Sequence, residues 1–409
     1  MRLLLVADTY PPSCISGALQ MRDLAVALAR QGHRPLILTP TDQPGQRVRL
    51  EEHDGVQVLR VRAPRTKDVP YMRRTLAELV LPWVLLRGLN ASVLRHERWD
   101  GVIWYSPTIF LGKVAKAIKR RSRCPGYLIV RDLFPDWAAD AGVLKKGGLA
   151  YRCFKRVERF QYRQADMIGV QTPSNAPLVA CDAPAARIEV LHNWLSPLTV
   201  PAGMQSTDPS SLLGDFESRI NFVYAGNMGV AQDMGAFIAL AKRMQGRADV
   251  GFIFIGRGSE VARLKVEAQA LSNLLVLDEV SPERLSEVLA HCHVGIVALH
   301  PAHATHNIPG KLLTYLNAGL PVLARVNPNN DLVALVEREG VGLTVSGDNP
   351  ALLHVHALRL ADDSGLRAAM GQEGRALARR LFSPESAARQ LTSRLMERAE
   401  SDTGTRRAT

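Results

Sequence analysis

Residues 307–323 read NIPGKLLTYLNAGLPVL, which predicts a loop, a short helix and a buried strand in succession. Pro309 suits the first turn of that helix, Gly319 suits its C-terminus, and residues 321–324 are apolar enough for a strand. Lys311 would then lie among the unpaired amide N–H groups of a helix N-terminus, which suits phosphate. The stretch predicts an α/β fold with a nucleotide diphosphate site, although a surface lysine on an ordinary crossover is the simpler interpretation of this stretch alone.

The same alternation of short apolar segments and helical patterns runs along the whole chain. The apolar segments are residues 3–7, 35–39, 56–61, 102–105, 126–130 and 187–191 in the first half, and residues 220–224, 250–255, 274–277, 294–298, 321–324 and 342–345 in the second. Short apolar strands separated by helices predict parallel sheets that are covered on both faces. We therefore expect two Rossmann-like, doubly wound domains that face each other across a ligand-binding cleft, beyond the carboxyl ends of their strands.

The 409 residues are enough for two domains, and a change in composition marks the boundary between them. Pro, Ser, Gly and Asp accumulate over residues 197–215, which we expect to link a domain at residues 1–196 to a second domain at residues 216–382. A helix is expected at residues 383–400 and a disordered tail at residues 401–409.

Cysteine usage and apolar runs indicate the compartment. The five widely spaced cysteines include no C-x-x-C pair, which favours reduced thiols in the cytoplasm over a zinc site or a disulfide framework. The apolar run after Met1 is too short for a signal peptide, and residues 79–86 are too few to span a bilayer. We therefore expect a soluble or peripheral protein.

Positive charge is concentrated in the first half of the chain. Residues 1–196 hold 30 Lys and Arg against 17 Asp and Glu, whereas residues 197–409 hold 21 against 22. The excess is densest at residues 113–123, where Lys113, Lys116 and Arg120 share one helical face, and at residues 145–163. Because no base-reading motif accompanies these clusters, we expect an anionic membrane surface or an anionic acceptor, and no nucleic acid. A merely solvated basic face is the alternative.

Three loops of the second half follow predicted strands and would meet at one edge of a sheet. They contain Gly226, Asn227 and Gly229; Gly256 and Arg257; and Glu279 and Val280. Glycines let backbone N–H groups approach phosphate, and Arg257 with Lys311 could neutralise a leaving diphosphate. Together with the helix start at residues 309–311, the loops predict a donor site, and no D-x-D pattern suggests a metal there.

The chain resembles the glycosyltransferase family 4 enzymes of the two-Rossmann GT-B fold over nearly its whole length. The resemblance lies in the loop that ends at Gly17, in residues 24–33 (LAVALARQGH), 162–166 (YRQAD) and 191–194 (LHNW), and in the helix after Phe382, which crosses back to the first domain in that fold. The chain is most similar to bacterial enzymes of O-antigen, capsule and colanic-acid polysaccharide biosynthesis, including an L-fucosamine transferase group. Those enzymes carry stretches like RDLFPD at residues 131–136, GNMG at 226–229 and IPGK at 308–311.

The resemblance implies a retaining, metal-independent transferase without a cofactor. Its donor would be a UDP-sugar and its acceptor a lipid-linked saccharide, carried on polyprenyl diphosphate at the inner face of the plasma membrane. The donor contacts would be Gly17, Gly226, Asn227, Gly229, Gly256, Arg257, Glu279, Val280, His306, Ile308, Pro309, Gly310, Lys311 and Thr314. Lys311 and Arg257 would stabilise the leaving diphosphate. On the acceptor side Asp132 and Asp136 are candidate catalytic carboxylates; the alternatives are an ion pair of Asp132 with Arg131 and a helix cap by Asp136.

The chain departs from the family pattern at two places. Many members have two glutamates at the last motif, where this chain has His306 and Thr314, and this leans toward a deoxy or N-acetylated donor sugar. Members also have arginine and lysine after the first strand of the second domain, where this chain has Asn227 and Gln232. Two other functions remain open: a non-hydrolysing UDP-N-acetylglucosamine 2-epimerase, and a non-catalytic membrane-docking subunit of the same fold.

Overall fold

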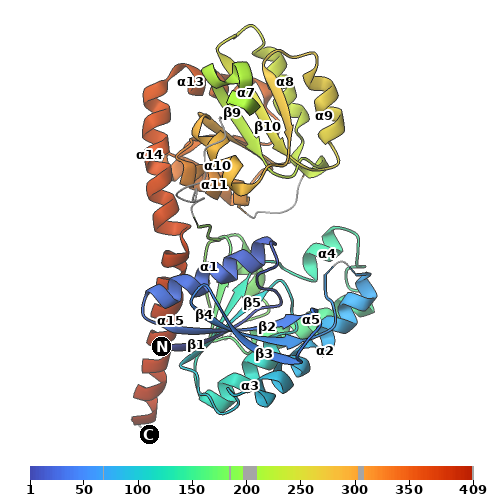
Figure 1. Cartoon of the computed structure of the whole chain (residues 1–409), viewed down its shortest axis with the longest axis vertical. Helices are drawn as coiled ribbons and strands as arrows, with labels where there is room; N and C mark the ends of the chain where they lie inside the picture. Colours follow the sequence, from blue (N-terminus) through green and yellow to red (C-terminus); the bar gives the residue numbers. More distant parts are fainter. Residues whose placement is uncertain (68, 184–185, 197–209, 303–307, 408–409) are drawn as a thin grey trace. The chain divides into compact units, whose positions relative to one another are not determined.

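The computed structural model describes residues 1–67, 69–183, 186–196, 210–302 and 308–407, with the backbone alone for residues 210–211 and 402–407. The chain divides into two compact units (Figure 1). Unit 1 consists of Met1–Trp194 and Pro384–Thr409, and unit 2 consists of Leu195–Ser383. Each unit is an α/β domain built around its own sheet, so the predicted fold class is confirmed.

Unit 1 has an eight-stranded sheet of order β3-β4-β2-β1-β5-β6-β7-β8, in which β3 pairs antiparallel with β4 and the other pairs are parallel. Its strands are β1 (Arg2–Val6), β2 (Arg34–Thr41), β3 (Val48–His53), β4 (Val56–Arg62), β5 (Gly101–Ser106), β6 (Gly126–Val130), β7 (Met167–Val170) and β8 (Arg187–Val190). Its helices are α1 (Ser16–Arg30), α2 (Tyr71–Ala91), α3 (Gly112–Ser122), α4 (Asp136–Asp140), α5 (Leu149–Tyr162), α6 (Asn175–Ala180) and α15 (Pro384–Arg407).

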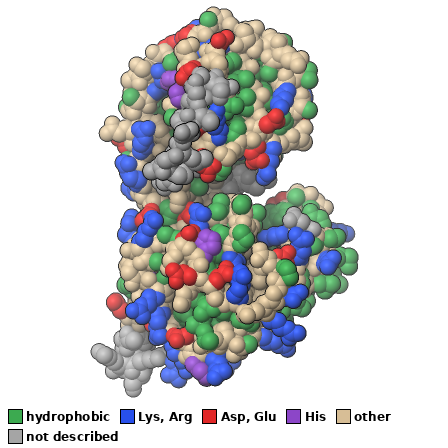
Figure 2. Space-filling model, viewed as in Figure 1, with side chains coloured by type: hydrophobic (Ala, Val, Ile, Leu, Met, Phe, Trp, Pro, Cys, Tyr) green, Lys and Arg blue, Asp and Glu red, His purple; other side chains and the backbone are tan. Residues whose placement is uncertain are grey.

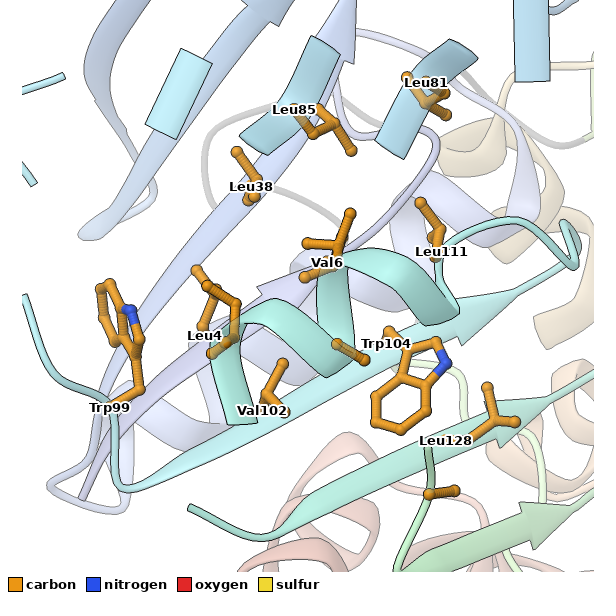
Figure 3. Packing of buried hydrophobic residues seen from close by; sticks show 14 of the residues in the cluster. Leu4, Val6, Leu38, Leu81, Leu85, Trp99, Val102, Trp104, Leu111 and Leu128 are labelled. Carbon is orange, nitrogen blue, oxygen red and sulfur yellow. The ribbon is translucent and has the colours of Figure 1, made fainter. Parts of the chain in front are cut away.

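Side chains that alternate along β1, a central strand of unit 1, contribute to two hydrophobic cores. Leu4 and Val6 of β1 face a core shared with α2 and α3, part of which Figure 3 shows. Leu3 and Leu5 face the other way, into a core shared with α1 and α15. Because successive side chains of a strand point to opposite faces, one apolar pentapeptide serves both layers.

Unit 2 has a parallel six-stranded sheet of order β11-β10-β9-β12-β13-β14. Its strands are β9 (Ile220–Ala225), β10 (Val250–Gly256), β11 (Leu274–Asp278), β12 (Val294–Ala298), β13 (Val322–Val326) and β14 (Gly342–Ser346). Its helices are α7 (Ser210–Leu213), η1 (Gly214–Ser218), η2 (Val230–Gln232), α8 (Gly235–Arg243), α9 (Val261–Ala268), α10 (Pro282–Ala290), α11 (Gly310–Ala318), α12 (Asp331–Glu339), α13 (Pro350–Asp362) and α14 (Ser364–Leu381). Helices α10, α11, α12 and α14 cover one face of the sheet, and α8, α9 and α13 cover the other.

The predicted strands agree with the structure to within two residues, and two strands, β3 and β7, were not predicted. Two expectations for the connections were wrong. The expected linker already contains α7 and η1 from residue 210 on, because Leu213 packs into the core of unit 2. The tail expected to be disordered from residue 401 instead continues α15 to Arg407, where no proline interrupts the helix. In the described ranges, no helix is long and apolar enough to cross a membrane.

Candidate functional site

The candidate donor residues of unit 2 gather where the order of its strands reverses. The first strand of the unit, β9, lies between β10 and β12, so the chain winds one way from β9 to β11 and the other way from β12 to β14. The loop after β9 begins at Gly226, and the connection after β12 ends at Lys311. In open parallel sheets, ligands bind in the crevice at the carboxyl ends of the strands at such a reversal.

Lys311 lies in the first turn of α11 and is half-buried. Its Nζ lies 4.9 Å from the centroid of the Tyr224 ring, and a Cβ added at Gly226 would meet its Cε at 2.9 Å. Burial lowers the pKa of Lys311 to about 8. Among the described residues Lys311 has no carboxylate partner, so its positive charge lacks the counter-ion that a buried cation normally has.

Helix α11 begins one residue later than the sequence predicts, at Gly310, because Pro309 takes the capping position with extended backbone angles. Proline has no side-chain group that could accept a hydrogen bond from the first amides of the helix. The Leu312 N–H donates to the Pro309 carbonyl over 3.1 Å, so the N–H groups of Gly310 and Lys311, which have no side-chain cap, are the ones that can face a ligand beside the Lys311 ammonium. The expected C-terminus is confirmed: Gly319 ends α11 with φ of 75°.

Two glycines let the loops after β9 and β10 touch. Gly226 and Gly256 have φ values of 131° and 150°, and a Cβ at Gly256 would lie 1.9 Å from the carbonyl oxygen of Gly226. The Gly226 N–H donates to the carbonyl of Ile255 over 2.8 Å, and the Met228 N–H donates to the carbonyl of Arg257 over 2.7 Å. No residue with a side chain fits this approach, which holds the two loops together through backbone hydrogen bonds.

The second predicted cation, Arg257, differs from Lys311 in its exposure and in having a carboxylate partner. Its side chain is 77% exposed, and its Nη1 lies 3.3 Å from an oxygen of Glu279. Arg257 and Glu279, both predicted donor residues, thus pair with each other across the loops after β10 and β11. The exposed guanidinium would have to give up this partner to contact a ligand.

Asn227 and Gln232 brace the loop after β9. The Gln232 Oε1 accepts a hydrogen bond from the Asn227 side-chain amide over 3.1 Å and from the Gly229 N–H over 3.0 Å. These two amides occupy the positions where many relatives would have an arginine and a lysine. In this chain they shape the loop and add no positive charge.

The remaining candidates are spread more widely. Thr314 lies one turn after Lys311 on α11, and Ile308 and Val280 pack on the core of unit 2. Gly17 belongs to unit 1, in the first turn of α1, where a Cβ would meet the Tyr105 ring at 3.1 Å. His306 lies outside the described residues.

Sequence reasoning missed three residues that contact the candidate donor residues or their loops. The Tyr224 ring lies beside the Lys311 ammonium, and the Tyr315 hydroxyl accepts from the Ala225 N–H over 2.8 Å. Buried Arg325 bonds to Asp233 over 2.7 Å and to Asp348, which ties the loop after β9 to β13. The spacing of Lys311 and Tyr315, one turn apart on a helix, was the available signal for one of them.

The two acceptor-side carboxylates of unit 1 differ in their surroundings. Asp132 follows β6 and has neither a hydrogen bond nor an ion pair within the described part of the chain. The ion pair with Arg131, which was the alternative to a catalytic role, is absent because that guanidinium donates to the carbonyls of Leu191 and His192. Although part of Asp132 reaches solvent, desolvation of its carboxyl raises its pKa, and Lys67 opposes the shift.

Asp136 is not the helix cap that its position suggested. Pro135 holds the capping position of α4, and the two oxygens of Asp136 accept hydrogen bonds from Tyr151 over 2.6 Å and from Lys155 over 2.7 Å. Lys155 also pairs with Glu158 and Asp182. Asp136 therefore fixes α4 against α5, while Asp132 is the carboxylate that has no protein partner.

Two family models match the chain, one in each unit. Residues 17–194 match the glycosyl transferase 4-like domain, and residues 219–363 match the glycosyl transferases group 1. The chain belongs to glycosyltransferase family 4. Its GT-B fold consists of the two Rossmann-like units, and the two models together cover most of both.

Known proteins similar to this family 4 chain include an enzyme and solved structures. It is 25% identical over 293 residues to the probable glycosyltransferase WbjE of Pseudomonas aeruginosa, which covers 71% of this chain and 72% of that protein. Anabaena Alr3699/HepE in complex with UDP has a TM-score of 0.64 at 16% identity, covering 97% of this chain and 100% of that one. Sucrose-phosphate synthase of Thermosynechococcus elongatus has a TM-score of 0.68 at 17% identity, covering 98% and 99%. The likeness to the solved structures shows the GT-B fold alone.

A metal ion at this family 4 site would need a cluster of side chains that can bind it. Throughout the part of the chain that the structure describes, no group of three or more His, Cys, Asp or Glu side chains is placed to hold a metal ion.

Proposed function

We propose that the chain is a retaining glycosyltransferase that moves a sugar, of the deoxy or N-acetylated class, from a UDP-sugar to a polyprenyl-diphosphate-linked acceptor in cell-surface polysaccharide biosynthesis. The observation that carries the proposal is Lys311, a half-buried, desolvated cation without a carboxylate partner among the described residues, at the start of α11 and beside two glycine loops. A diphosphate supplies the missing negative charge there. The UDP in the HepE complex, a neighbour with the same fold, supports uracil as the base of the donor.

In this proposal the leaving diphosphate is stabilised by Lys311 and the first-turn amides of α11. Donors aimed at the charge that develops on the leaving oxygen lower the barrier without a metal ion. In a retaining transfer the leaving phosphate takes the proton of the attacking hydroxyl on the same face of the sugar. Asp132, a carboxylate of unit 1 with a raised pKa, is the candidate acceptor-side carboxylate.

A donor screen tests the proposal. UDP, GDP and a panel of their sugars are tested for binding by thermal shift, and each binder is incubated with lipid-linked acceptors, with and without EDTA. We expect UDP-sugars to bind and one of them to be transferred, with the product linkage retaining the donor configuration and EDTA leaving the rate unchanged. Conversion of the donor without transfer would favour the epimerase, and binding without turnover would favour the docking subunit.

Unit 1 carries the features of a peripheral membrane surface. Helix α2 exposes an apolar stripe at helical spacing, and α3 beside it exposes basic side chains; the stripe is Tyr71, Met72, Leu76, Leu79, Val80 and Trp83. The Lys113 ammonium lies 3.7 Å from the centroid of the Trp83 ring, at the border of the two surfaces. Figure 2 shows hydrophobic and basic side chains together over the part of unit 1 that holds α2, α4 and α5 in Figure 1. Apolar insertion and attraction to anionic headgroups together support peripheral docking at the inner face of the plasma membrane.

Neutralising the basic face should release the protein from anionic vesicles. Lys116, Arg120 and Arg123 are exposed, whereas Lys119 pairs with Asp166 at 2.6 Å and Arg121 donates to the carbonyl of Leu94, so the latter two are left intact. Each removed charge costs about 1 kcal/mol near an anionic surface, so the triple glutamine variant should bind phosphatidylglycerol vesicles on the order of a hundredfold more weakly in co-sedimentation at low salt. A control neutralises Lys242, Arg243 and Arg379 of unit 2. Equal release of both variants, or of neither, would contradict docking through α3.

A further inference from the structure

Two cavities of opposite character lie at the carboxyl edge of the sheet in unit 1. The first, of about 350 Å³, has a polar lining from the segments after β1, β2 and β4. Its lining includes Asp8, Tyr10, Ser13, Thr41, Gln43 and Thr66. One oxygen of buried Asp8 and the buried hydroxyl of Tyr10 have no hydrogen-bond partner in the described part of the chain. A cavity rich in hydroxyl, amide and carboxylate groups suits a polyhydroxylated ligand.

The second cavity, of about 290 Å³, is lined mostly by aromatic and aliphatic side chains. They include Ile109, Phe110, Phe134, Trp137, Leu144 and Phe154. The Phe134 ring centroid lies 5.1 Å from that of Phe154 and 6.1 Å from that of Trp137, so these rings form a continuous wall.

Three polar residues that line this second cavity, Arg74, Glu78 and Thr108, already bond to one another, whereas the exposed Asp132 has no hydrogen bond in the described part of the chain. Glu78 is buried and accepts hydrogen bonds from Arg74 and from Thr108, each over 2.7 Å. A sugar would gain few new hydrogen bonds from them, whereas a hydrocarbon would bury its surface against the rings. Tyr71, which lines this cavity, is also the first residue of the exposed apolar stripe of α2, so a longer hydrocarbon could continue along that stripe. The lining and its continuation therefore favour a hydrocarbon chain over a second sugar.

Lys67 lines both cavities. Its ammonium lies 2.9 Å from Asp8, and its side chain is 38% exposed, so it can turn from that carboxylate to a ligand. A cation at the junction of a polar and an apolar cavity suits an anionic linker between a polar and an apolar part of one molecule.

We propose that these cavities bind one amphiphilic acceptor, with its saccharide in the first cavity, a phosphate at Lys67 and the start of its hydrocarbon chain in the second. The proposal rests on the glycosyl transfer proposed above and goes further, because it assigns the acceptor's parts to residues. The saccharide and the lipid would bind in neighbouring cavities at the same edge of the sheet. Because the two cavities share Lys67, only a short saccharide fits between them and the acceptor carries few sugars. The enzyme would then act early in the assembly of a lipid-linked glycan, after the reaction that attaches the first sugar to the lipid phosphate.

Calorimetric titration of the full-length protein with farnesyl phosphate, farnesol and inorganic phosphate tests the lipid and phosphate positions. Farnesyl phosphate should bind at least about tenfold more tightly than either of the others. Trp137→Ala should weaken it roughly tenfold, because this ring forms part of the cavity wall. Leu352→Ala is the control: its side chain is also large, apolar and exposed, 37% against 44% for Trp137, and it lies in unit 2, outside the lining of either cavity. Equal affinities of these two variants would overturn the assignment of the hydrocarbon.

The phosphate position has its own pair of variants. Lys67→Met should weaken farnesyl phosphate about tenfold and leave farnesol unchanged, since only the former has a charge to lose. Lys265→Met is the control, because Lys265 also pairs with an aspartate, at 2.7 Å, and is 42% exposed, but lies in unit 2. If Lys67→Met binds both probes like the wild type, the phosphate does not contact Lys67.

The saccharide position is tested with a probe that carries one sugar on the farnesyl phosphate. The added sugar should tighten binding, and the double variant Thr41→Val, Gln43→Ala should remove that gain without changing the affinity for farnesyl phosphate. A gain that survives in the double variant would place the sugar elsewhere. UDP is titrated into every variant as well. If the wild type does not bind UDP, the proposed donor is wrong. The titrations with the isoprenyl probes would still test the acceptor site.

Discussion

Replacing Lys311 with alanine is expected to weaken UDP binding and to lower kcat/KM by roughly ten- to hundredfold. A charge-assisted contact in a desolvated site contributes about 1.5–3 kcal/mol, and Lys311 has no carboxylate partner among the described residues. Arg257→Ala should cost less, because Arg257 is 77% exposed and already paired with Glu279. Calorimetry with UDP and initial rates with the donor found by the screen measure both effects.

The pH dependence separates a binding role of Lys311 from a structural one. Its pKa of about 8 lies below the usual value, so the free protein loses the charge as the pH rises through 8, and the affinity for a diphosphate should fall over the same range. In Lys311→Ala that decline should disappear. The variant should also unfold at no lower temperature than the wild type without ligand, since it no longer buries a cation. A variant that is less stable but keeps its UDP affinity would show that the lysine serves the fold.

Gly256→Ala is expected to abolish UDP binding and to lower the free energy of unfolding of unit 2 by about 3 kcal/mol. The new Cβ would lie 1.9 Å from the carbonyl oxygen of Gly226. Neither atom belongs to a flexible side chain that could rotate away, so the loops after β9 and β10 must separate. The positive φ of 150° adds strain for any residue with a side chain. Chemical denaturation and UDP calorimetry measure the two effects.

The control for this variant is Gly246→Ala, in the same unit. A Cβ at Gly246 would have no atom within 4 Å, so neither stability nor UDP affinity should change appreciably. If Gly256→Ala behaves like Gly246→Ala, the close approach of the two loops is not needed for donor binding.

The elements that could be predicted from the sequence are those whose pattern reflects burial on both faces. The strands at residues 126–130 and 294–298 match β6 and β12 to the residue, because each is a fully buried apolar run. Strand β3 reads VRLEEH and was missed, since it is an antiparallel edge strand with three of its six residues exposed. Strand β7 has only four residues, too few for a periodic signal.

The candidate site divides in the same way. Lys311 could be located because proline and glycine mark the ends of its helix, which is local information. The pairing of Arg257 with Glu279 and the role of Asp136 against Lys155 could not, because they join segments whose approach depends on the folded sheets. The roles assigned to these residues remain predictions that the variants above test.

Helix α15 affects how the chain is made. Its Ala388, Leu391 and Leu395 fill the core of unit 1 between β1 and α1, yet they are synthesised after the whole of unit 2. On the ribosome, unit 1 must therefore wait with an open apolar groove while unit 2 emerges and folds, and only the last helix closes it. Such a groove is a natural site for a chaperone during translation. For the same reason we expect residues 195–383 to be the better fragment for expression alone. An N-terminal fragment that stops before residue 384 would lack α15, which completes one of its hydrophobic cores.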